Sequence, residues 1–168
     1  LRDEYIKKIN DFVASYEDIS ESERAVITEK GESFIAQINR ATTAGDITYM
    51  WTRARATIVE YFENLENARQ NAEDAINKYV DNLDYTKNEL DYIKTLANEQ
   101  INLIKVEAII EVINNISSNF ISMADLLHEE LVLERETSIN LLKAEIQAWY
   151  TTSQVEYINE LIEEASVK

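Results

Sequence analysis

Apolar residues recur every three or four positions along most of the chain, which is the spacing of amphipathic helices. Residues 2–17 carry the first apolar stripe and residues 21–40 the second. A third stripe begins near Asp46, and its apolar members are Ile47, Trp51, Ala54, Ile58, Phe62 and Leu65. The pattern predicts three consecutive helices, each with one apolar and one charged face.

The sequence signals that would end one helix and start the next are present in one place and absent in another. The segment 41–45, "ATTAG", holds a glycine and two threonines, which favour the end of one helix and the start of the next. Residues 64–81 hold no such stop signal and several alanines. We therefore expect one continuous helix over about residues 46–83.

Signals for a helix start recur at a nearly fixed distance. A capping box joins a Ser or Thr at the helix N-cap to a Glu or Gln three residues later. Ser20 and Thr86 are 66 residues apart, and Thr86 and Thr151 are 65 apart; their box partners are Glu23, Glu89 and Gln154. Similar apolar residues flank all three boxes, so the sequence indicates a repeat of about 66 residues.

A repeat of this length accommodates three helices of ordinary size. The predicted fold class is all-α, with tandem three-helix, spectrin-like bundle repeats that share long connecting helices and form an extended rod. The predicted units are a first repeat at residues 1–66, a second at 67–132, and a partial third repeat of two helices at 133–168.

The second repeat has no counterpart of the "ATTAG" segment. Its helix either breaks somewhere within residues 106–119, where Asn114–Asn119 is the nearest turn-prone cluster, or continues unbroken from about residue 87 toward residue 149. We favour the break.

Composition supports a helical protein. The chain of 168 residues has no proline and only two glycines, and folds with many strands need frequent turn residues. The formal net charge is −16, which disfavours binding to nucleic acid or to an anionic membrane surface. No apolar run approaches the roughly 20 residues of a membrane-spanning helix, so we expect no membrane insertion. Cysteine is absent, which excludes disulfides and thiol chemistry.

The residues that could carry chemistry do not form a catalytic pattern. His128 is the only histidine, and the segment "HEELV" that it begins lacks the second histidine of a zinc-protease helix. Acidic pairs such as Glu163–Glu164 lack the loop that calcium sites need. We expect no enzymatic activity, no cofactor and no metal site.

One aromatic and basic segment stands out in the acidic chain. Trp51 falls in register with the apolar stripe and is expected in the core, whereas Tyr49, Arg53 and Arg55 are candidate protein-contact residues, since aromatic residues and arginine are enriched in binding hot spots. Trp149, near the third cap, is expected to pack against the second helix of its repeat.

Three segments carry a family resemblance: "ISESERAVI" at Ile19–Ile27, "FIAQINRATTAGDI" at Phe34–Ile47 and "ARATIVEY" at Ala54–Tyr61. They resemble the tandem three-helix-bundle repeats of Gram-positive bacterial cell-surface proteins and adhesins. The resemblance is best in the first repeat, where "INRAT" at Ile38–Thr42 fits the turn of that family. It implies a secreted bacterial stalk or adhesion segment.

Together these observations favour a non-enzymatic structural or adhesive segment of an extracellular bacterial surface protein. The segment would serve as a spacer or stalk, as a fragment of a larger cell wall-associated protein. Its expected partners are a host or matrix protein and the neighbouring repeats of the parent chain. The alternative is an amphipathic helical bundle that carries lipid or an apolar ligand.

Overall fold

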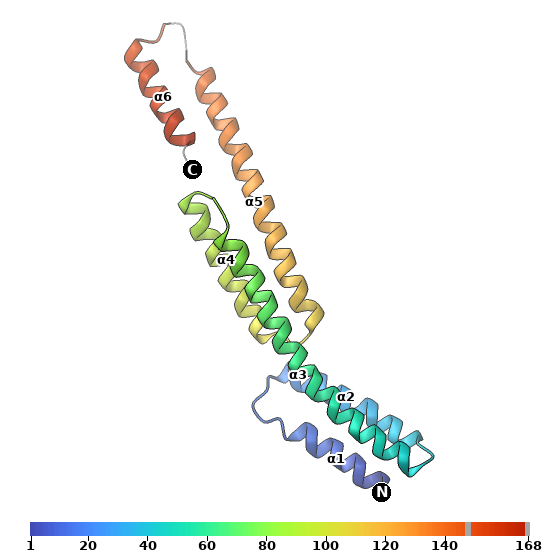
Figure 1. Ribbon diagram of the computed structural model, residues 1–168. Coiled ribbons are helices and arrows are strands. Elements are labelled where there is room, and N and C mark those ends of the chain that lie inside the picture. Colours follow the sequence, from blue (N-terminus) through green and yellow to red (C-terminus); the bar gives the residue numbers. More distant parts are fainter. Residues whose placement is uncertain (147–148, 167–168) are drawn as a thin grey trace. The chain divides into compact units, whose positions relative to one another are not determined.

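The computed structural model describes residues 1–146 and 149–166, and within them every regular element is an α-helix (Figure 1). The helices are α1 (Arg2–Ala14), α2 (Glu21–Arg40), α3 (Ala44–Asp81), α4 (Lys87–Val106), α5 (Ile110–Ala144) and α6 (Thr152–Ser166). The predicted all-α class is confirmed. Among the described residues, none of these helices has the length and apolarity needed to cross a membrane.

The helix starts follow the capping signals of the sequence. Before α2, the backbone N–H of Glu23 donates to Ser20 Oγ at 3.1 Å, and the N–H of Ser20 donates to Glu23 Oε2 at 2.7 Å. Thr86 with Glu89 and Thr151 with Gln154 form the same reciprocal pairs. Each pair satisfies backbone donors that the first turn of a helix leaves without a partner.

The long third helix is continuous, as the missing stop signal predicts. It spans 38 residues and begins two positions earlier than expected. Thr43 caps it, because Thr43 Oγ1 accepts from the backbone N–H of Asp46 at 3.1 Å. The first helix is shorter than expected: it ends at Ala14, so that Tyr16 lies in the connection to α2.

The break in the second repeat is present, but it does not use the turn-prone cluster. Helix α4 ends at Val106 and α5 begins at Ile110, so the break lies at residues 107–109. The backbone N–H groups of Ala108 and Ile109 both donate to Glu107 Oε1 at 2.8 Å. One carboxylate therefore replaces the cap threonine of the first repeat, and Asn114–Asn119 is helical.

The chain forms two compact units. The first comprises Leu1–Ala75 and Ile101–Ile116, and the second comprises Ile76–Gln100 and Ser117–Lys168. Helices α3, α4 and α5 each contribute residues to both units. The predicted repeat limits after residues 66 and 132 fall inside α3 and α5 and stay a prediction.

The first unit packs α1, α2 and the first part of α3 around a common core of Ile9, Ile38, Ile47 and Ala54. Trp51 and Phe34 pack against this core from its edge. Helices α1 and α2 approach closely at Gly31, where a Cβ atom would lie 3.1 Å from Val13 Cγ2. A small residue is therefore needed at this crossing.

The second unit buries apolar residues from four helices: Ile76 and Val80 of α3, Ile93 and Ala97 of α4, Phe120 and Ala124 of α5, and Ile162 of α6. Trp149 does not join them. Its side chain is 78% exposed, so the expected packing of Trp149 against the second helix of its repeat is wrong. The residue lies in the connection before α6, outside any helical face that could present it to a core.

Candidate functional site

The three candidate contact residues all lie in α3 and are all exposed. Tyr49 is 58% exposed, and Arg53 and Arg55 are exposed as well. They do not form one cluster, because residues four apart share a helix face whereas residues two apart do not. Tyr49 and Arg53 therefore lie on one face and Arg55 on another.

Trp51 lies toward the core, in agreement with its register. Its ring meets Phe12 of α1 edge to face, with centroids 5.8 Å apart, while the neighbouring Ala54 is fully buried. Aromatic pairs in this arrangement stabilise by about 0.5–1.5 kcal/mol beyond the burial of their area. The role of Trp51 is thus explained by packing.

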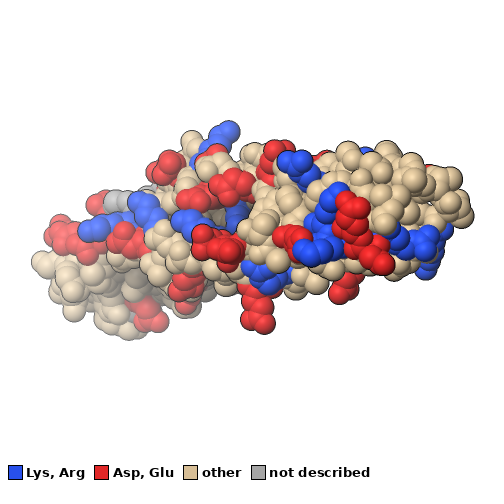
Figure 2. Space-filling view, turned by 90° about the horizontal axis from the view of Figure 1, so that it is seen from below, with Lys and Arg blue, Asp and Glu red and all other residues tan. Residues whose placement is uncertain are grey.

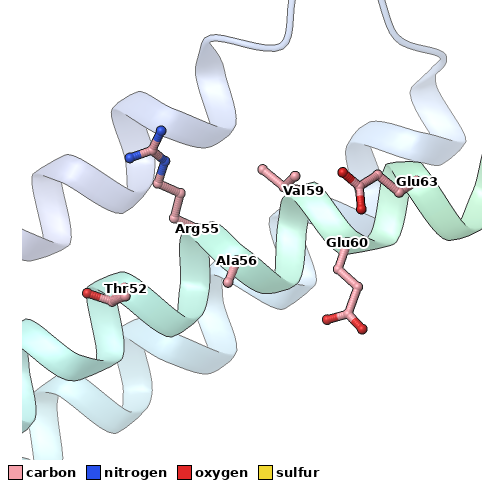
Figure 3. A pocket seen from close by; sticks show the side chains of 6 residues that line it. All are labelled: Thr52, Arg55, Ala56, Val59, Glu60 and Glu63. Carbon is pink, nitrogen blue, oxygen red and sulfur yellow. The ribbon is translucent and has the colours of Figure 1, made fainter.

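An open groove runs along α3 beside Arg55 (Figure 3). Its lining residues are Thr52, Arg55, Ala56, Val59, Glu60 and Glu63. In Figure 3, Arg55, Val59 and Glu63 project on the same side of the helix, and Glu60 projects on another. The groove thus offers a cation, an exposed valine and a carboxylate in a row.

Aromatic packing also surrounds Tyr16, in the connection after α1. Burial raises the pKa of the Tyr16 hydroxyl, and the positive charge of Arg55 opposes that rise. The ring of Tyr16 stacks on Phe62 of α3 at a centroid distance of 4.8 Å. This phenol is a packing residue that stays protonated at neutral pH.

A buried ion pair ties α2 to α3 in the first unit. Arg69 Nη1 lies 3.0 Å from Glu23 Oε1, and Arg69 Nη2 donates to the carbonyl oxygen of Glu107 at 2.7 Å. Tyr61 Oη donates to the neighbouring carbonyl of Ala108 at 2.9 Å. Two side chains of α3 therefore hold the backbone of the α4–α5 connection, while Arg69 also neutralises the capping glutamate of α2.

The second unit contains the equivalent pair 66 residues later. Arg135 Nη2 of α5 lies 3.4 Å from Glu89 Oε2, and His128 Nδ1 lies 3.2 Å from Glu89 Oε1. The His128 ring stacks on Tyr85 at 3.8 Å, nearly parallel. His128 thus has structural partners: a carboxylate and an aromatic ring.

Both capping glutamates are held ionised. Burial alone would raise the pKa of Glu23, but hydrogen bonds from Ser20 and the charge of Arg69 outweigh it and hold that pKa below its usual value. The same balance lowers the pKa of Glu89, where Thr86, His128 and Arg135 oppose the effect of burial.

A further polar contact in the second unit joins α3 to α5. Tyr79 Oη donates to Asp125 Oδ1 at 2.6 Å, and its ring meets Phe120 edge to face. Burial, followed by the bond to Asp125, raises the pKa of Tyr79. Asp125 and His128, which are three residues apart, thus serve separate contacts. In the described part of the chain, no three His, Cys, Asp or Glu residues gather as a metal site would require.

Charged side chains of both signs lie on the surface. On the face seen in Figure 2, acidic and basic side chains are interspersed. Exposed pairs such as Lys7–Asp11 and Lys8–Glu4 are spaced i, i+4 along α1. Such pairs contribute little to stability but keep a helical surface well solvated.

The spacing of two arginines in the sequence is a signal for the ion pairs with the capping glutamates. Arg69 and Arg135 are 66 residues apart, the spacing that also separates Glu23 from Glu89. A search for charged residues at the repeat distance would have found them. That Glu107 stabilises the α4–α5 connection has no comparable sequence signal.

Comparison of the chain with models of protein families, with characterised proteins and with solved structures yields no match.

Proposed function

We propose that this chain is a non-enzymatic segment of tandem helical repeats that serves as a spacer or stalk of an extracellular bacterial surface protein. The observation that carries the proposal is the duplicated ion pair: Glu23–Arg69 in the first unit and Glu89–Arg135 in the second. In each case the glutamate closes a capping box and the arginine comes from the following long helix. Two partly buried contacts repeated at one sequence distance favour a duplicated structural unit.

The helices that pass through the predicted repeat limits support a mechanical role. Residues 66 and 67 lie in the middle of α3, and residues 132 and 133 lie within α5. A helix shared by two repeats transmits orientation from one to the next, because bending it breaks backbone hydrogen bonds. Repeats joined in this way form a spectrin-like rod.

Small-angle X-ray scattering of the chain tests the rod. An elongated particle is expected, with a radius of gyration well above the roughly 15 Å of a globular protein of this length. A radius near the globular value would refute the stalk.

The location outside the cell rests on the resemblance to Gram-positive surface repeats. Antibodies against the chain, applied to intact cells of the source bacterium, are expected to label the surface. Labelling only after lysis would contradict the proposal.

Binding of a host or matrix protein is the adhesive form of the proposal, and it would be carried by Tyr49 with Arg53 on one face of α3 or by Arg55 on the other. The double variant Arg53→Ala/Arg55→Ala should weaken binding to a purified serum or matrix protein at least tenfold. The control Arg40→Ala removes an exposed cation of α2 and should not. Equal binding by wild type and the double variant excludes this contact.

The alternative function, a bundle that carries lipid or an apolar ligand, is favoured by one feature of α5. This helix exposes Met123, Leu126, Leu133 and Leu141 to solvent. Its acidic surroundings oppose binding to anionic lipid, so neutral vesicles are the informative probe. Clearance of turbid phosphatidylcholine vesicles by the chain would support this function, and unchanged turbidity would exclude it.

A further inference from the structure

The hairpin formed by the last part of α5 and by α6 leaves open a side that is covered at the equivalent positions earlier in the chain. Within the second unit, α6 is anchored by Ile162, which is buried. The positions matched to Ile162 by the repeat distance are Ala97 and Gly31, which are buried too. Gly31 is the residue that faces Ile9 and Val13 of the first helix of its repeat. The position that faces the first helix in the first repeat is therefore buried in all three predicted repeats.

Apolar positions that are fully buried in the first two repeats are less buried in the described part of the third. Ile27 and Ile93 are fully buried, whereas the matching Ile158 of α6 is half-buried. Ile9 and Ile76 are fully buried as well, whereas the matching Leu142 of α5 is half-buried. Both helices of the hairpin thus have partly exposed apolar side chains at positions that are buried in the first two repeats.

The capping residue of α6 shows the same difference. Glu23 and Glu89 are each 9% exposed, because Arg69 and Arg135 of the following helix cover them. Gln154, the third member of the series, is exposed, although its Oε1 accepts from the N–H of Thr151 at 2.9 Å as the capping box requires. The capping box of α6 is formed, but Gln154 stays exposed where Glu23 and Glu89 are buried.

We propose that this hairpin is an acceptor surface for one amphipathic helix of the kind found at residues 44–69 and 110–135, supplied by a neighbouring repeat. The inference rests on the proposed repeat function and specifies its partner. The partner helix needs apolar residues at the spacing of Ile47, Ala54, Ile58 and Leu65, which fill the equivalent side of the first repeat.

The neutral side chain of Gln154 sets a further requirement. A buried carboxylate needs a cation, and Arg69 and Arg135 meet that need in the first two repeats. An amide needs only hydrogen bonds, so the helix that covers α6 does not need an arginine opposite Gln154. This surface therefore differs in specificity from the first two.

A chain extended in register tests the proposal. A copy of residues 104–135 is appended after Lys168, which continues α6 with the sequence that follows the matching position of α4. Amide hydrogen exchange is then measured over residues 152–166 by mass spectrometry. We expect exchange in α6 to slow at least tenfold, because the appended helix closes the open side of the hairpin.

The matched control carries the same appended copy with aspartate in place of the residues that repeat Ile113 and Phe120. This copy cannot bury its apolar face, so α6 should exchange as fast as in the natural chain. The variant Gln154→Glu in the extended chain recreates the ion pair with the copied arginine and should slow exchange further. Equal exchange in the extended chain and in its aspartate control would overturn the proposal.

This outcome is separable from the scattering test of the stalk. Protection of α6 together with a compact natural chain would retain the acceptor surface and reject the rod. An elongated natural chain with no protection of α6 would retain the rod and reject the acceptor surface.

Discussion

Arg69 and Arg135 occupy equivalent positions but hold their glutamates differently. Arg69 makes a 3.0 Å contact with Glu23 and also donates to the Glu107 carbonyl, whereas the 3.4 Å contact of Arg135 is shared with His128. The Nε–H of Arg69 is buried without a hydrogen-bond partner among the described residues, which reduces the net gain. Removing either arginine would leave a buried carboxylate without its cation, and such a loss is more costly than the pair is favourable.

The variant Arg69→Met should lower the free energy of unfolding by about 2–3 kcal/mol, because Glu23 and the Glu107 carbonyl both lose a partner. The matched variant Arg135→Met should cost only about 1 kcal/mol, because His128 remains next to Glu89. Urea unfolding followed by circular dichroism measures both. A larger loss of stability in Arg135→Met than in Arg69→Met would mean that the contacts described do not determine how much each arginine stabilises the fold.

The lowered pKa values of Glu23 and Glu89 predict acid sensitivity. Both groups have a usual pKa of 4.5, and in the folded state they release their protons at lower pH than in the unfolded chain. Their contribution to stability is therefore complete above pH 4.5 and is lost as the pH falls through the folded-state values. The double variant Glu23→Gln/Glu89→Gln should lose less of its free energy of unfolding as the pH falls. The exposed Glu29→Gln serves as control, and an unchanged acid slope in the double variant would exclude the two glutamates as its cause.

At the scale of the helix, the two glycines have opposite roles. Gly31 lies at the α1–α2 crossing, where an added Cβ would be 3.1 Å from Val13, whereas a Cβ at Gly45, in the first turn of α3, would meet only Thr43 Oγ1 at 3.7 Å. The first glycine permits close packing of two helices. The second is replaceable, since neither glycine has a positive φ.

Gly45→Ala should raise the melting temperature slightly, with a gain of about 0.5 kcal/mol from the reduced freedom of the unfolded chain. Gly31→Leu should lower it markedly, by about 1–3 kcal/mol, because the side chain would force α1 away from α2. Thermal unfolding of both variants measures the contrast. Similar melting temperatures would show that the crossing of α1 and α2 tolerates a large residue.

At the scale of the whole molecule, the two compact units are linked by shared helices instead of flexible linkers. Helix α3 belongs to the first unit up to Ala75 and to the second from Ile76. Unfolding one unit therefore frays a helix on which the other depends. This coupling predicts that the natural chain unfolds in a single transition.

A proline in the shared helix should uncouple the units. Asn71 is exposed in the middle of α3, so Asn71→Pro disturbs the backbone without opening the core. It should cost about 3 kcal/mol or more and split the calorimetric transition into two. The control Asn71→Ala should keep one transition. Two transitions already in the natural chain would show that the shared helix does not couple the units.

The sequence by itself determined the helices and most of their limits. Apolar spacing and capping boxes act within a few residues of one another, so α2 and the unbroken α3 could be predicted from local patterns. The placement of Trp51 in the core followed from the same register. That Arg55 lies on a different face of α3 from Tyr49 and Arg53 also follows from the sequence, because residues two apart in a helix do not share a face.

Only the tertiary structure decided where the second repeat breaks. The α4–α5 connection has no glycine or threonine; its carbonyls are held by Tyr61 and Arg69, 47 and 38 residues away along the chain. Local propensity favoured a turn at Asn114–Asn119, but burial of Ile113, Ser117 and Phe120 keeps that segment helical. Contacts between distant residues can override a local preference of a few tenths of a kcal/mol per residue, and short sequence patterns do not record such contacts.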